Sequence, residues 1–275
     1  MWLMNAQLSV IRGTGNMVLP ARVTMVTALI QIAVGGALGL GLGPFPMWGL
    51  AGVACGTIAG YGAGALWLFR RLRSGRERLQ LRFAGTPLRW PLFADILKVG
   101  AVACLSPLQA VTTMLVCTAL IAPLGTQVLA GYGIGQRLEF LLIPVSFGIG
   151  VAAVPMVGMA IGAGLVERAR RVAWTAALVS LINLGVIGLL VAAFPSIWTD
   201  LFSSDAEVLS AAATQLRWVG PAFGFFGFGL TLYFAAQGSG RIAGPVLAAS
   251  VRLLLVVVLG FTLQAANAPM WAYFA

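Results

Sequence analysis

Histidine is absent from this 275-residue sequence, and acidic residues are scarce, with seven against 17 Lys and Arg. Without imidazole ligands, a zinc or haem site is disfavoured. The three cysteines, Cys55, Cys104 and Cys117, fall inside apolar stretches without metal or redox spacing, so we interpret them as small packing residues. The sequence also contains no cluster of acids and no nucleophile beside a base, which argues against an enzyme.

Charged residues are few as well, at 9% of the chain, compared with about 25% in an ordinary soluble domain. The mean hydropathy is +0.98, and apolar runs repeatedly reach the ~20 residues that cross a bilayer core. We therefore expect an all-α polytopic membrane protein with no soluble domain. The seven expected spans are Val18–Leu42, Gly49–Phe69, Ile96–Ile121, Val128–Ile161, Val172–Phe194, Leu216–Ala236 and Ile242–Ala265.

Basic residues are distributed unevenly along the chain, whose formal net charge is +10. They gather in alternate connections between the expected spans, at Arg12, from Arg70 to Arg89, from Arg168 to Arg171, and at Arg241. The connection at 195–215 carries only acids, and its "SDAE" at 204–207 is a capping box that predicts a helix start. Cytoplasmic loops of membrane proteins collect Arg and Lys. The pattern therefore predicts that the basic connections face the cytoplasm, and we expect no nucleic-acid partner.

Two polar, glycine-rich turns interrupt the apolar sequence in the same way. "RGTGNMVLP" at 12–20 returns as "QGSGRIAGP" at 237–245, an offset of 225 residues (238 − 13) between the matching glycines. "PMW" at 46–48 returns at 269–271. The order and offset indicate an internal duplication. Six spans separate the two turns, so the halves are expected to be parallel repeats. Twelve helices would complete the pattern, and we expect roughly a third of the parent protein to lie outside this chain, mostly before it.

The stretch "IRGTGNMVLP", followed by "GLGPFPMWGLAGVACGT", is similar to the fifth and sixth helices of the multidrug and toxic compound extrusion (MATE) transporters. "GYGIGQRLEFLLIPVSFGIG" with "VGMAIGAGLVERARR" resembles the eighth helix and the loop after it, and "GPAFGFFGFGLTLYFAAQGSGR" resembles the tenth. The resemblance implies a MATE-like bundle of two lobes: residues 1–69 would end the first lobe, 70–93 would form a basic cytoplasmic linker, and 94–275 would form the second lobe.

The resemblance also implies a function. It implies efflux of small organic, often cationic, compounds by antiport with H⁺ or Na⁺, from a monomer in the bacterial inner membrane, with no cofactor beyond the coupling ion. Some members carry a coupling carboxylate on the seventh helix, but "GAVACLSPLQAVTTMLVCTAL" contains none here. Others use an acid on the first helix, which we expect to lie outside this chain. A lipid-linked precursor flippase of related fold and a truncated, non-transporting remnant therefore remain alternatives.

Glu139 is the acid that lies deep in an expected span. If that span begins near Val128, Glu139 lies about 17 Å along it, near the middle of a ~30 Å core. A carboxylate there is costly and marks a functional site by default. Gly131, Gly135 and Glu139 share one helix face, which leaves room for a cavity or a close helix. Arg137, two positions away, points elsewhere, and a structural contact between helices is the alternative for Glu139.

Other polar and aromatic residues are weaker candidates for the transport path. The intramembrane polar candidates are Gln31, Gln109, Asn183 and Arg252, together with Arg137. Interhelical hydrogen bonds are the alternative for the amides. In the aromatic run on the sixth span, Phe226 and Tyr233 can stack on flat cationic compounds. Their alternative role is packing or contact with lipid. The sequence predicts no metal site.

Overall fold

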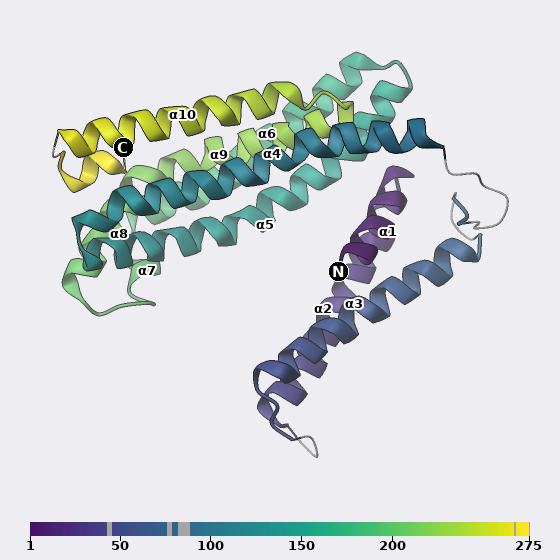
Figure 1. Cartoon of the computed structure of the whole chain (residues 1–275), viewed down its shortest axis with the longest axis horizontal. Helices are drawn as coiled ribbons and strands as arrows, with labels where there is room; N and C mark the ends of the chain where they lie inside the picture. The colour runs from purple at the N-terminus through teal and green to yellow at the C-terminus, as the bar shows by residue number, and fades with distance from the viewer. Residues whose placement is uncertain (43–45, 76–78, 82–88, 267, 275) are drawn as a thin grey trace. The chain divides into compact units, whose positions relative to one another are not determined.

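The computed structural model describes residues 1–42, 46–75, 79–81, 89–266 and 268–274, and within these ranges every regular element is helical. Among the described residues, seven helical segments are long and apolar enough to cross a membrane, as the sequence predicts. The chain divides into two compact units, Met1–Leu88 (unit 1) and Arg89–Ala275 (unit 2), whose helices are labelled in Figure 1. Much of the expected linker, at 76–78 and 82–88, lies outside the described residues, so the boundaries at 69 and 93 stay a prediction.

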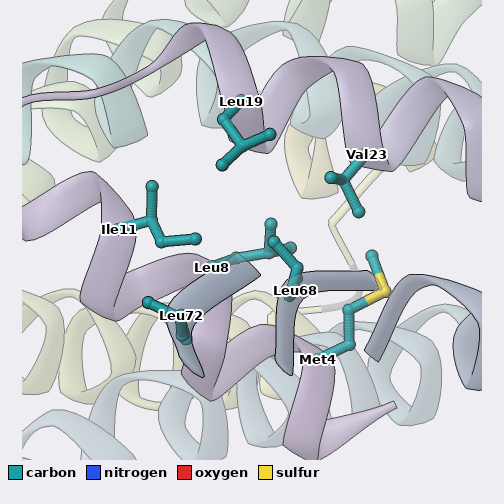
Figure 2. Packing of buried hydrophobic residues seen from close by; sticks show 7 residues of the cluster. All are labelled: Met4, Leu8, Ile11, Leu19, Val23, Leu68 and Leu72. Atoms are coloured by element: carbon teal, nitrogen blue, oxygen red, sulfur yellow. The ribbon is translucent and has the colours of Figure 1, made fainter. Parts of the chain in front are cut away.

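The described part of unit 1 contains three helices held together by a small apolar core. They are α1 (Trp2–Gly13), α2 (Val18–Leu40) and α3 (Leu50–Arg73). Apolar residues three or four apart on each helix face the others, and Figure 2 shows the side chains of this core converging. Its buried members are Met4, Leu8, Ile11, Leu19, Val23, Leu68 and Leu72. Helices α2 and α3 approach so closely that a Cβ atom on Gly56 would collide with the backbone of Gly35.

Unit 2 is a bundle arranged around the long helix α5. Its elements are α4 (Trp90–Ile121), η1 (Ala122–Leu124), α5 (Thr126–Gly162), α6 (Val166–Ala193), α7 (Ser196–Thr199), α8 (Ala206–Val219), η2 (Gly220–Ala222), α9 (Phe223–Ser239), α10 (Ala243–Ala265) and η3 (Met270–Tyr273). Helix α5 packs against α6, α8 and α9, whereas α10 packs mainly against α4. In Figure 1 these long helices run side by side. The central core consists of Leu138, Leu142, Leu184, Leu216 and Phe223.

The two glycine-rich turns have the same local structure. Gly15 and Gly240, 225 residues apart, adopt left-handed φ angles of 84° and 73°, which glycine adopts without steric cost. In each turn this glycine donates its N–H to a carbonyl three residues earlier, at 2.9 Å and 3.0 Å respectively. The helices that follow, α2 and α10, both contain 23 residues. The structure therefore supports the duplication at the level of individual hydrogen bonds.

Several helices extend beyond the expected apolar spans. Helix α6 begins at Val166, so the cluster from Arg168 to Arg171 lies in its first turns and not in a loop. Helix α3 likewise continues to Arg73, which places three arginines in its last turn. Arginine is a good helix former, and cations are favourable at a helix C-terminus, so α3 continues after its apolar run ends.

The sixth expected span begins earlier than predicted. Helix α8 starts at Ala206, ten residues before the expected Leu216. The cap is also shifted by one residue from the predicted Ser–Glu capping box. Asp205 is the N-cap, and its carboxylate accepts hydrogen bonds from the backbone N–H groups of Glu207, at 2.9 Å, and Val208, at 3.4 Å. Asp is as good an N-cap as Ser, which explains how the predicted helix start is right while the capping residue is different.

Candidate functional site

Glu139 lies in the interior of unit 2, on the central helix. It follows Thr126, the first residue of α5, by 13 positions, or about 20 Å along the helix. Its side chain is half-buried, and its Oε2 accepts a hydrogen bond of 2.9 Å from Nε2 of Gln136, one turn earlier. The amide therefore satisfies part of the carboxylate's hydrogen-bonding capacity and leaves acceptor sites for a further partner.

A close helix, and not a cavity, occupies the small face that precedes Glu139. A Cβ atom on Gly131 would lie 2.7 Å from the Cβ of Ala211, and one on Gly135 would collide with the side chain of Gln215. Both contacts are with α8. The glycine spacing leaves room for either a cavity or a close helix, and the structure has the close helix.

The basic and polar neighbours of Glu139 come from α4, α10 and its own helix α5. Arg252, on α10, interacts electrostatically with Glu139, as do Tyr132 and Cys117. Arg137 points elsewhere, as its two-residue spacing predicts, and its Cζ lies 5.0 Å from the ring centroid of Phe202. Glu139 thus interacts with a cation on α10 and with polar neighbours, which is an arrangement that can accept a proton or a small cation.

Gln109 links two helices of unit 2. Its Nε2 donates a hydrogen bond of 2.6 Å to Oγ of Ser250, which joins α4 to α10. The interhelical alternative to a substrate role is therefore observed. Two acceptors on this part of α4, Oε1 of Gln109 and Oγ of Ser106, are buried without a partner among the described residues, so the region retains polar capacity that the helices themselves do not use.

Tyr233 has a definite partner that its sequence position does not reveal. Pro107, inside α4, has no N–H and cannot donate to the carbonyl of Ala103 four residues earlier. The hydroxyl of Tyr233, on α9, donates to that carbonyl at 3.3 Å. Tyr233 therefore compensates for the proline on a neighbouring helix, which is a structural role in addition to the predicted aromatic one.

The structure gives each of the three remaining candidates its own surroundings. Phe226 packs against the central core of unit 2. Asn183 is exposed, and its Nδ2 donates at 2.9 Å to the carbonyl of Val179 on its own helix. Gln31 belongs to unit 1, where its side chain covers Gly60. The assignment of these three side chains to a transport path stays a prediction.

Sequence reasoning missed several polar residues of the bundle interior. Gln136 is the direct partner of Glu139, and its i, i+3 spacing is the signal that identifies it. Gln215 is 3% exposed, with its Oε1 unpartnered in the described structure. Ser146 and Ser180 pair through their hydroxyls at 3.1 Å between α5 and α6. Among the described residues, no group of three or more His, Cys, Asp or Glu side chains could hold a metal ion.

The family model described as MatE matches residues 103–262, which is more than half of the chain and includes the helix that carries Glu139. The chain is similar to the probable multidrug resistance protein NorM of Thermotoga maritima, with 28% identity over 243 residues, covering 87% of this chain and 51% of that protein. It is also similar to a FAD transporter of Shewanella oneidensis, with 24% identity over 258 residues, covering 90% and 55% respectively.

A solved structure with the same fold is a mutant of the Vibrio cholerae MATE transporter VcmN. Its TM-score is 0.85 at 22% identity, and the alignment covers 98% of this chain and 60% of that one. The chain thus spans about half the length of the curated relatives it matches.

Proposed function

Since the chain belongs to the MatE family, we propose that it forms part of a secondary transporter that expels small organic, mostly cationic, compounds in exchange for H⁺ or Na⁺. Its seven spans make it a multi-pass membrane protein, of the kind found in the bacterial inner membrane. Several relatives carry names for multidrug resistance, and one is named a FAD transporter. Because the chain spans about half of these proteins, the transport activity belongs to the whole protein, and we expect it to act as a monomer.

The observation that carries this proposal is the position of Glu139. In the described part of the chain it is the carboxylate deepest within a candidate span. A carboxylate within the membrane can exchange a proton or a monovalent cation, and such groups mark ion pathways in transporters. Its hydrogen bond from Gln136 leaves acceptor sites free, and Arg252 supplies a counter-charge from α10. The ion that Glu139 exchanges and the substrates are part of the proposal.

Substitution of Glu139 tests the proposal. In the complete reading frame, Glu139→Gln should reduce ion-driven efflux of a cationic dye to the level of cells without the transporter, while the amount of folded protein stays constant. Gln keeps the shape and hydrogen bonding of Glu but cannot ionise. If Glu139 serves only the fold, Glu139→Gln would pump normally, whereas Glu139→Ala would lower the folded yield. Normal efflux by the Glu139→Gln variant would exclude a role for Glu139 in coupling ion exchange to efflux.

A lipid-linked precursor flippase is the second candidate. Its cavity should be strongly basic in order to hold a pyrophosphate. The deep basic residues are Arg137 and Arg252, and Arg137 lies over the ring of Phe202, so the observed charges favour efflux of cations. Expressing this chain with and without any upstream part of its reading frame separates the efflux transporter from a non-transporting remnant, which would confer no efflux in either form.

A further inference from the structure

A groove between the end of α5 and the start of α6 has the features of a lipid-binding site. It has a volume of about 290 Å³ and is lined by Met156, Met159, Ala160, Ala163, Leu165, Arg168 and Val172. Room for roughly ten water-sized groups is enough for part of one acyl chain and too little for a large compound. The lining contains one cation and no anion, and the rest is apolar.

The groove lies where a membrane surface should be. Both α5 and α6 are candidate spans, and the connection between them is only the short segment 163–165. Trp174, further along α6, is 49% exposed, as expected of an aromatic side chain at a membrane interface. Glu139 precedes Met156 by 17 residues on α5, or about 25 Å. The groove is therefore separate from the proposed coupling site.

The apolar wall of the groove is accessible and adaptable. Met156, Met159 and Leu165 are 47%, 48% and 50% exposed, although they line a concave surface. Methionine side chains are flexible and fit irregular apolar partners. Ala160 is only 3% exposed and belongs to the small core beneath the groove. The wall is thus suited to a flexible hydrocarbon chain.

Arg168 provides the polar end of the groove. Within the part of the chain that the structure describes, its guanidinium has no hydrogen-bond or carboxylate partner. Glu167 is its sequence neighbour, and adjacent residues do not face each other on a helix. Arg171 lies one turn further along the same side of α6 and adds positive charge. Arginine pairs with phosphate through two parallel hydrogen bonds, and basic pockets between membrane helices on the cytoplasmic side bind anionic lipid headgroups.

We propose that this groove binds an anionic phospholipid of the cytoplasmic leaflet, with its phosphate on Arg168 and one acyl chain along Met156 and Met159. The lipid would fill the groove between α5 and α6 near their short connection. The proposal concerns a resident lipid and does not depend on which compound is transported or on whether Glu139 couples transport.

Native mass spectrometry of the purified full chain, with equal amounts of phosphatidylglycerol and phosphatidylcholine, tests the proposal. We expect the wild type to retain phosphatidylglycerol preferentially and Arg168→Gln to bind it about tenfold more weakly, the loss typical of one charge-assisted contact. Arg170→Gln is the matched control, because it removes the same charge from the same helix outside the groove. Met159→Trp should fill the groove and exclude the lipid without changing thermal stability.

A phosphatidylglycerol with a photoreactive acyl chain should label the segment that contains Met156 and Met159. Equal retention of the two lipids, or equal effects of Arg168→Gln and Arg170→Gln, would overturn the proposal. Displacement by inorganic phosphate alone would assign Arg168 to a soluble anion and would also overturn it. If Arg168→Gln does not fold, the Met159→Trp variant decides. Lipid retention by this variant equal to that of the wild type would exclude the groove as the lipid site.

Discussion

At the scale of single residues, prolines inside the long helices create polar groups that neighbouring helices satisfy. Pro107 leaves the carbonyl of Ala103 without its helical donor, and Tyr233 supplies a hydroxyl from α9. A carbonyl without a partner inside a bilayer is costly. The contact therefore gives a structural reason for a tyrosine in this aromatic run, for which the sequence leaves open stacking on a substrate, packing and contact with lipid.

We expect Tyr233→Phe to destabilise unit 2 by about 0.6–1 kcal/mol, the usual cost of one hydrogen bond between membrane helices. The ring and its contact with Phe234 would remain. Thermal unfolding in detergent measures the loss. In a Pro107→Ala background the restored N–H can satisfy the carbonyl of Ala103, so Tyr233→Phe should then cost less. An equal cost in both backgrounds would mean that the hydroxyl has another role.

The sequence predicts the central candidate Glu139 because a carboxylate deep in an apolar span is rare enough to identify by inspection. Its surroundings are less predictable, because they depend on which helices are neighbours. Gln136 follows from helical spacing, but Gln109 meets Ser250 across 141 positions, and no local pattern indicates that pair. Asn183 is a polar residue within an apolar span, as a site residue would be. However, its side chain is exposed and donates a hydrogen bond to its own helix.

At the scale of helical elements, unit 2 depends on close approach between α5 and the helices around it. Gly131 lies against the backbone of α8, where an added Cβ would be 2.8 Å from the N atom of Ala212. Small residues allow helix backbones to approach in membranes, where association depends on van der Waals contact. The same contact holds the segment of α5 that leads to Glu139.

Gly131→Ala should therefore push α5 away from α8 and destabilise unit 2 by about 1–3 kcal/mol, the typical cost of overpacking. Gly133→Ala is the matched control on the same helix, because a Cβ atom there meets nothing within 4 Å. Alanine is the better helix former, so the control should be neutral or slightly stabilising. Size-exclusion chromatography after heating measures how much folded protein remains for each of the two variants. A similar loss of stability in both variants would show that the close contact between α5 and α8 does not determine the stability of unit 2.

Composition predicts the positions at which helices begin and end less well than it predicts the helices themselves. Apolar runs identify the part of a helix that lies in hydrocarbon, but α6 begins six residues before its expected span, at Val166. The extra turn contains Glu167 and three arginines, which form helices readily in water. This boundary matters for function, since it places Arg168 on a helix face beside the methionines of α5.

At the scale of the whole molecule, the duplication and the number of spans could both be predicted, because each rests on a repeated pattern. Gly15 and Gly240 adopt the same conformation since the same local hydrogen bonds close both turns. The contacts within each unit could not be predicted in the same way. They depend on where small residues such as Gly56 and Gly131 allow two helices to touch, and hydropathy carries no information on partners.

The last prediction concerns the orientation of the chain in the membrane, which rests on the basic connections. Ser74, the C-cap of α3, follows three arginines, whereas Ser204 precedes Asp205 in the acidic connection. Both serines are exposed, which makes them a matched pair. In intact cells an impermeant thiol reagent should label Ser204→Cys readily and should label Ser74→Cys only after the membrane is permeabilised.

The parent chain, with Cys55, Cys104 and Cys117 in its spans, provides the background for the labelling. Labelling of Ser74→Cys from outside would reverse the topology, and it would also move the groove at Arg168 away from the leaflet that we propose. Because each span reverses the side, an odd error in the number of spans between the two serines would place both on one side. Opposite labelling of the pair therefore tests the orientation and the span count together.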